Sequence, residues 1–143
     1  MKGKLYKTSV RTAMVYGAET WAMRKVEEGV LLRAERAMVR MMCGVKLRNR
    51  KKTSELMSML EISEDIVTLV GRSRMRWYGH VMRRDVTVGI RKVLDVDVAG
   101  KVGKGRPRME WRQRVEKDVA KVGLLCEDVS DRPKWRSGLR SCH

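Results

Sequence analysis

The chain has 143 residues, and 33 Lys and Arg against 17 Asp and Glu give it a formal net charge of +16. That length is enough for one compact domain with a modest core or for two small helical subdomains. The charge favours a polyanionic partner, nucleic acid first, over a small-molecule substrate. A merely solvated basic face and an anionic membrane surface remain as alternatives. The sequence has no apolar run long enough for a spanning helix and no secretory core after its first residues. We therefore expect an intracellular protein, nuclear or cytoplasmic and not secreted.

The cysteines do not predict a disulfide framework, because Cys43, Cys126 and Cys142 are odd in number and scattered. We expect free thiols. No Cys-x-x-Cys or His-x-x-x-His pair joins them to His80 and His143, so the spacing predicts neither a zinc site nor another cofactor.

The N-terminal part of the chain has two helical patterns. Leu5 to about Trp21 carries an apolar stripe at three-and-four spacing, and Tyr16 and Trp21 are expected in the core. Val26–Cys43 is the clearest amphipathic helix, and Gly44 is its expected end. Three basic residues on another face of this helix are either solvated or in contact with phosphate: Arg33, Arg36 and Arg40.

A basic run, Lys46–Lys52, is predicted to be a loop, and such runs serve as nuclear-import signals or as phosphate contacts. Thr53 is the expected N-cap of a short helix that runs to residue 60. Ser63 is the expected N-cap of a longer helix, with Glu64 and Asp65 in its first turn.

The stretch from residue 72 to 84 combines five arginines, two adjacent aromatics and a histidine with no acid. Helical spacing places Trp77 on the buried face, whereas Tyr78 and His80 lie off that face and are better placed to stack on or hydrogen-bond to a ligand. No carboxylate, Ser or Cys beside His80 makes a catalytic arrangement. The phosphate contacts expected here are Arg72, Arg74, Arg76, Arg83 and Arg84.

Residues 86–98 alternate β-branched and polar side chains, which predicts a short strand or extended connector. Asp95 and Asp97 then belong to an exposed strand face rather than to a metal site. Ala99–Pro107 is a glycine-rich basic linker without the Gly-Lys-Ser/Thr ending of a P-loop. The segment 104–108 resembles the core of an AT-hook, although Pro107 also suits the first turn of a helix. The phosphate contacts expected here are Lys104, Arg106 and Arg108.

The C-terminal part is again helical in pattern. A helix is expected from Pro107 to Val122, with Gly123 after it, and a turn or short helix over Cys126–Ser130. Asp131 is the expected cap of a terminal helix whose inward side chains are Trp135 and Leu139.

Four motifs follow one another in an order that resembles the C-terminal region of the endonuclease–reverse transcriptase of non-LTR (LINE-type) retrotransposons. They are YGAETW (Tyr16–Trp21), RWYGHV (Arg76–Val81), GRPRMEW (Gly105–Trp111) and DRPKWR (Asp131–Arg136). The likeness extends from about residue 5 to residue 140.

The resemblance implies that the first helices match the polymerase thumb, which holds template and primer, and that the Trp77–His80 and Gly105–Trp111 segments belong to the region beyond it. The Ala-Asp-Asp or Tyr-x-Asp-Asp hairpin of this RNA-directed DNA polymerase family is missing from the sequence, and so is the spacing of the Cys/His knuckle found in some members. The resemblance therefore implies a non-catalytic fragment. Met1 would lie inside a longer ancestral frame, in a truncated, domesticated or degenerate copy.

Together these patterns predict a mainly α fold, a small helical bundle with a short extended or β connector and a C-terminal helical subdomain. The expected segments are a thumb-like part (1–60), a basic helix with its connector (61–98), and a basic linker with the last helices (99–143). The expected function is non-catalytic binding of RNA or DNA through phosphate contacts. The alternative is a basic protein-interaction module that binds a partner through Met38, Met41 and Met42.

Overall fold

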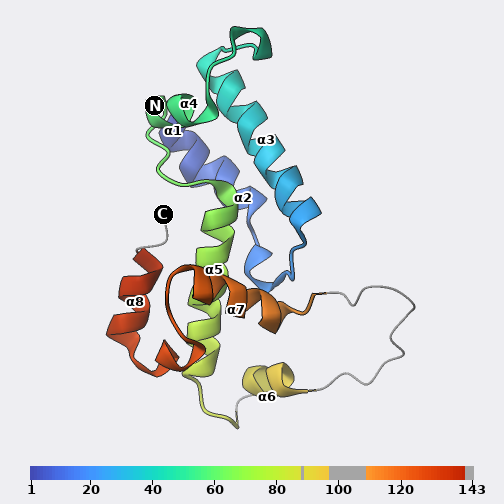
Figure 1. Ribbon diagram of the computed structural model, residues 1–143, viewed down its shortest axis with the longest axis vertical. Helices are drawn as coiled ribbons and strands as arrows, with labels where there is room; N and C mark the ends of the chain where they lie inside the picture. Colours follow the sequence, from blue (N-terminus) through green and yellow to red (C-terminus); the bar gives the residue numbers. More distant parts are fainter. Residues whose placement is uncertain (88, 97–108, 141–143) are drawn as a thin grey trace, which may run out of the picture. The chain divides into compact units, whose positions relative to one another are not determined.

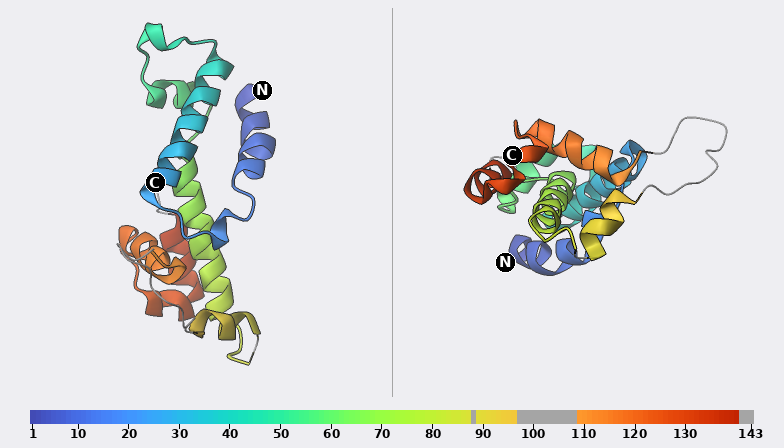
Figure 2. Two further views of the ribbon diagram at one scale, coloured as in Figure 1. Left: turned by 90° about the vertical axis from the view of Figure 1, so that its right-hand side faces the viewer. Right: turned by 90° about the horizontal axis from the view of Figure 1, so that it is seen from below.

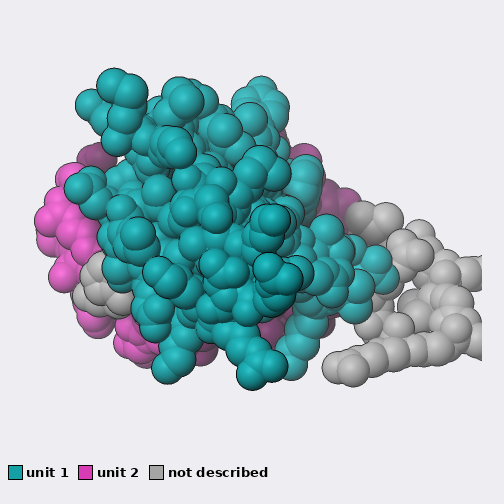
Figure 3. All heavy atoms as spheres, turned by 90° about the horizontal axis from the view of Figure 1, so that it is seen from above, with its two compact units in different colours: residues 1–71, 143 teal, residues 72–142 magenta. Residues whose placement is uncertain are grey.

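The computed structural model describes residues 1–87, 89–96 and 109–140, and every regular element in these ranges is helical (Figures 1 and 2). This confirms the mainly α fold. The chain divides into two compact units, residues 1–71 and residues 72–142, which have different colours in Figure 3. The boundary falls inside helix α5 (Ile66–Met82) and inside the predicted middle segment.

The first helical segment of unit 1 is shorter than predicted. Helix α1 (Lys2–Leu5), a π-helical turn and α2 (Arg11–Met14) follow one another, and Gly17 then takes a left-handed φ of 70°. The prediction that Tyr16 and Trp21 are core aromatics is wrong, because they are 85% and 50% exposed. The helix ends before both residues, so its apolar stripe does not continue to them.

Helix α3 (Lys25–Cys43) confirms the predicted amphipathic helix, and Gly44 ends it at a φ of 65°. Its buried residues include Val39 and also an acid, Glu35. Two small cores form this unit, and the larger contains Tyr6, Val39, Leu56 and Ile62. The smaller contains Ala18, Met23 and Val70.

The buried Glu35 joins three parts of unit 1. Its Oε1 accepts hydrogen bonds from Arg11 at 2.8 Å and from the Tyr6 hydroxyl at 3.2 Å, and its Oε2 accepts one from the Ile66 backbone N–H at 2.8 Å. Arg11 also donates to the Glu64 carbonyl. Burial, followed by the charge and hydrogen bond of Glu35, raises the pKa of Tyr6 to about 12. A charge with this many partners can be buried, because three hydrogen bonds, one of them from a cation, replace contacts with water.

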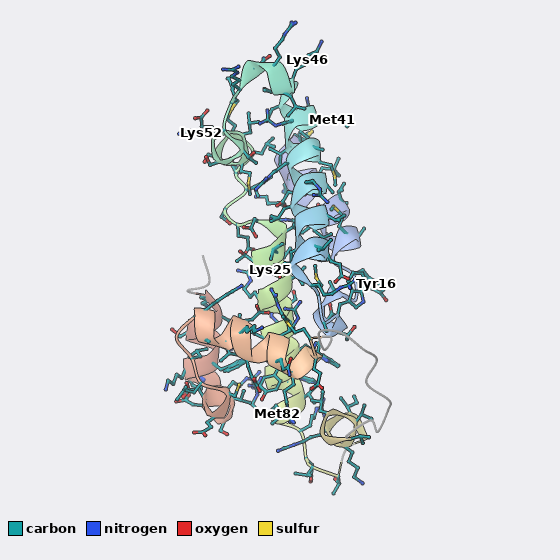
Figure 4. All side chains as sticks on the ribbon, turned by 45° about the vertical axis from the view of Figure 1, so that its right-hand side comes forward. Tyr16, Lys25, Met41, Lys46, Lys52 and Met82 are labelled. Carbon is teal, nitrogen blue, oxygen red and sulfur yellow. The ribbon has the colours of Figure 1, made fainter. Side chains whose placement is uncertain are left out.

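The loop at 46–52 is confirmed, with one 3-10 turn inside it, and Figure 4 labels Lys46 and Lys52 at its two ends. Helix α4 (Thr53–Met59) follows, and Thr53 is its first residue rather than its cap.

Helix α5 is capped by Asp65 instead of Ser63, since the Thr68 N–H donates to Asp65 Oδ1 at 2.7 Å. Residues 61–65 precede the helix in non-helical conformation, with Glu61 at a left-handed φ of 56°, and Ile62 among them packs into the larger core.

Unit 2 packs α7 (Trp111–Lys121) and α8 (Arg132–Arg140) against residues of α5 (Figure 1). Trp135 and Leu139 are buried as predicted, and Asp131 caps α8 by accepting the Lys134 N–H at 3.0 Å. The Trp135 indole donates to the Met75 carbonyl at 3.3 Å. Gly79 permits this approach, because a Cβ there would lie 2.5 Å from Trp135 Nε1. The remaining members of this core are Tyr78, Val115, Val119, Leu124 and Val129.

The predicted strand over residues 86–98 is wrong for residues 89–95, because these residues form helix α6 (Gly89–Asp95). Ile90 and Val93 are both exposed, so the β-branched side chains do not mark a buried strand face. Arg91 donates to the carbonyls of Met82 and Arg84, which ties α6 to the end of α5.

Asp97 and the linker Ala99–Pro107 lie outside the described residues. The later helix begins at Trp111 rather than at Pro107, after the N-cap Glu110.

Candidate nucleic-acid interface

Unit 2 contains a cleft of about 420 Å³ whose walls come from the end of α5 and from α8. Six of its nine lining residues are arginines and one is a histidine, and no described residue that lines it is acidic. We call it the arginine cleft. Its lining residues are Arg72, Arg76, His80, Arg83, Arg132, Trp135, Arg136, Leu139 and Arg140.

Helical spacing explains how each wall acquires its charge. The lining residues of α5 and its C-terminal end follow one another at intervals of four, four and three, and the arginines of α8 recur every four residues. Residues at these intervals share one face of a helix, and a step of four rises about 6 Å along the axis. Two rows of cationic side chains therefore line the same cleft, one from each helix.

One cleft arginine is held by a backbone carbonyl, and a buried aromatic lies in the cleft wall. Trp135 is almost fully buried, and Arg83 donates to the Val129 carbonyl at 3.2 Å. Burial, followed by repulsion from the Arg132 guanidinium, lowers the pKa of Arg83. Guanidiniums stay charged in proteins, so the crowding produces a positive potential instead of proton loss. The charge and shape of this cleft suit an anion with several negative charges.

A pair of stacked rings adjoins this cleft. His80 lines it and is exposed, and the partly buried Trp77 stacks on His80 with ring centroids 5.9 Å apart and an angle of 22° between the planes. Arg84, also exposed, lies with its Nη2 3.3 Å from His80 Nε2. Three planar groups thus follow one another along this side of α5 and the residues after it.

Two predicted contact residues are buried instead. Tyr78 is 5% exposed and lies between Trp111 and Trp135, with centroid distances of 6.1 Å to each. Burial, followed by the charge of Cys126, raises the pKa of Tyr78. Arg74 is 1% exposed and forms an ion pair with Asp118 of α7. Both predictions of an accessible side chain are wrong.

The reason is that the buried face of α5 passes through Arg74. Because arginine is a polar residue type, the spacing of the apolar residues alone places the buried face at Trp77. The buried face instead includes Arg74 and Tyr78, and Tyr78 is one residue from Trp77. Asp118, which neutralises Arg74, also lies 3.5 Å from Arg114 and 3.8 Å from Lys121. The sequence signal for this acid was its place beside Val115 and Val119 on the apolar face of α7.

Four of the other predicted contact residues lie together in the cleft. Arg72, Arg76, His80 and Arg83 line the cleft, and Arg84 is exposed beside His80. Lys104, Arg106 and Arg108 lie outside the described residues. Sequence reasoning missed three cleft residues whose signal was their spacing of four in the terminal helix: Arg132, Arg136 and Arg140.

Unit 1 has a hollow of a different kind. Its volume is about 540 Å³, and its lining is mostly apolar: Trp21, Ala22, Met23, Glu27, Val30 and Leu31.

The predicted methionine face of α3 is divided, because Met41, labelled in Figure 4, is 79% exposed whereas Met38 and Met42 pack against the larger core. Arg33 and Arg36 of α3 are exposed, and Arg40 donates to the Lys51 carbonyl at 2.9 Å.

Across residues 1–87, 89–96 and 109–140, no three His, Cys, Asp or Glu side chains are grouped as metal ligands would be. In the same part of the chain, no helix is both long and apolar enough to cross a membrane. Comparisons with protein families, with curated proteins and with solved structures found no match to this chain.

Proposed function

We propose that this chain is a non-catalytic nucleic-acid-binding fragment whose arginine cleft holds the phosphate backbone of RNA or DNA. The observation that carries the proposal is the lining of the cleft, six arginines and a histidine from two helices with no acid among its described lining residues. Guanidiniums bind phosphate oxygens through charge-assisted and often bidentate hydrogen bonds. A spacing of about 6 Å between successive arginines suits an extended backbone with repeated charges better than a single small anion.

The proposal includes the origin that the motifs indicate, the region downstream of the polymerase core of a non-LTR retrotransposon reverse transcriptase. Its support is the order of the four motifs in the sequence. Two of them also supply the arginine cleft: the motif Arg76–Val81 contributes Arg76 and His80, and the motif Asp131–Arg136 contributes Arg132 and Arg136.

A salt titration tests the proposal. Each phosphate that a protein neutralises releases condensed counterions, so the logarithm of the affinity falls linearly with the logarithm of the salt concentration. Contact with about six phosphates gives a slope of roughly −5 for a duplex and roughly −4 for a single strand. Fluorescence anisotropy with labelled oligonucleotides measures this slope, and a slope near zero contradicts the proposal.

A matched pair of variants separates the cleft from net charge. Arg132→Gln with Arg136→Gln removes two charges from the cleft, and Arg33→Gln with Arg36→Gln removes two from exposed positions of α3. We expect the first variant to flatten the salt slope by about 2, because each lost phosphate contact changes it by about 1. The second variant should keep a slope close to that of the original chain. Equal losses would assign the binding to overall charge.

The second candidate is a protein-interaction module, and the apolar hollow of unit 1 favours it. Trp21, Val26 and Val30 are at least half exposed at or beside that hollow, an arrangement more typical of a contact surface than of a solvated face. This function predicts binding that Trp21→Ala weakens and that nucleic acid does not inhibit. Pull-down of a partner with and without nuclease treatment distinguishes the two candidates.

A further inference from the structure

Resting on that proposed function, we infer that the ligand of the arginine cleft is a single strand with unpaired bases, and that one base stacks on the Trp77–His80 pair. The inference joins two features of unit 2, a cleft with cations on both walls and a ring pair that begins in the cleft wall. Neither feature alone distinguishes a single strand from a duplex, but together they do.

The cleft favours one backbone. Arg76 on one wall and Arg136 on the other belong to different helices, and both line the same volume of about 420 Å³. A strand lying in the cleft is therefore contacted from two sides along its length. A duplex instead presents two backbones separated by a groove of about 6 or 12 Å, so a cleft of this kind holds only one of them.

The ring pair favours a free base. His80 is exposed where it lines the cleft, and Trp77 stacks behind it at 5.9 Å. Aromatic rings beside a cationic groove bind the face of a base in a way that tolerates any sequence. Within a duplex, both faces of each base are already stacked on neighbours, so only the two terminal base pairs have a face available to His80. Only an unpaired base can use the cleft and the rings together.

Three probes with equal numbers of phosphates test the inference on the full chain: an oligothymidylate, an abasic strand of the same length, and a blunt duplex. At one salt concentration, we expect the oligothymidylate to bind at least about fivefold more tightly than either of the others, because base stacking adds to the phosphate contacts that all three share. A duplex that binds as tightly as the oligothymidylate, or more tightly, overturns the inference.

Two variants locate the stacking. His80→Ala should remove the preference for the oligothymidylate over the abasic strand, and it should weaken the abasic strand and the duplex much less, because only the oligothymidylate offers an unpaired base to stack on the ring. Trp77→Leu should have the same effect, and its thermal unfolding is measured alongside because Trp77 is partly buried. If His80→Ala weakens all three probes alike, the ring pair does not read bases and the inference fails.

The failure of the proposed function gives a different result. In that case none of the three probes binds with a salt-dependent affinity, in the original chain or in the variants. Binding of all three with a normal salt slope but without preference for the oligothymidylate leaves the proposed function standing and removes only the single-strand inference.

Discussion

The two units share one use of arginine and differ in another. Unit 1 buries Arg11 against Glu35, and unit 2 buries Arg74 against Asp118. Unit 2 in addition gathers six arginines in one cleft that no described acid lines. The difference is that each buried arginine faces a carboxylate from another helix, whereas the cleft arginines share a lining without a described acid. A buried pair holds helices together, and we propose that the clustered arginines of the cleft hold an external anion.

The largest expected effect comes from removing a buried carboxylate charge. Asp118→Asn should lower the free energy of unfolding by about 3–5 kcal/mol, because the buried Arg74 guanidinium then loses the opposite charge of Asp118. Urea denaturation followed by circular dichroism measures the change. Glu27→Gln, which removes the charge from the exposed ion pair with Arg24 but keeps a side-chain oxygen that can accept the Arg24 backbone N–H, is the matched control and should lower the midpoint much less. A loss in the control as large as that of Asp118→Asn would break the distinction between buried and exposed pairs.

The Glu35 network of unit 1 predicts a loss of stability at alkaline pH. The pKa of Tyr6 is raised to about 12 in the folded chain, so between pH 10 and 12 the unfolded chain binds fewer protons at this residue than the folded chain does. The free energy of unfolding should therefore fall over that window, by about 2–3 kcal/mol in total from Tyr6.

The comparison for this pH effect is Tyr6→Phe, which lacks the titrating hydroxyl. Its free energy of unfolding at neutral pH should be lower, since the hydrogen bond to Glu35 is lost, but its decline between pH 10 and 12 should be shallower than that of the original chain. Parallel declines in the two proteins would assign the alkaline loss to other groups.

The packing of α8 predicts a smaller effect. Gly79→Ala puts a methyl group 2.5 Å from Trp135 Nε1, so α8 has to move and the free energy of unfolding should fall by about 1–3 kcal/mol. Because Trp135 lines the arginine cleft, oligonucleotide affinity should fall as well. Gly29→Ala in α3 meets no atom within 4 Å and is the control, expected to be neutral or slightly stabilising. A stable Gly79→Ala chain with unchanged affinity would show that this close approach is unimportant.

The sequence was sufficient where a signal is local. The long amphipathic pattern and Gly44 predicted α3 with nearly correct ends, and Asp131 predicted the cap of α8. It failed where an acid and an arginine from different helices neutralise each other, because Arg74 and Asp118 are 44 residues apart and each appears polar alone. The cleft follows the same rule: its α5 wall is a dense run of arginines, whereas the α8 wall is recognisable only after the two helices are placed together.

The smallest effect on stability should come from an arginine of the cleft. Comparing that arginine with the buried Arg74 separates ligand-binding arginines from structural ones most clearly. Arg76 is exposed and lines the cleft, so Arg76→Gln should change the free energy of unfolding by less than about 0.5 kcal/mol. The same substitution should flatten the salt slope of oligonucleotide binding by about 1. Arg74→Gln, two residues away, should instead destabilise the fold, because the buried ion pair between Arg74 and Asp118 is lost. At temperatures below the unfolding midpoint of the Arg74→Gln variant, the salt slope of its oligonucleotide binding should equal that of the original chain. If both variants flattened the slope equally, the division between structural and ligand-binding arginines on α5 would be wrong.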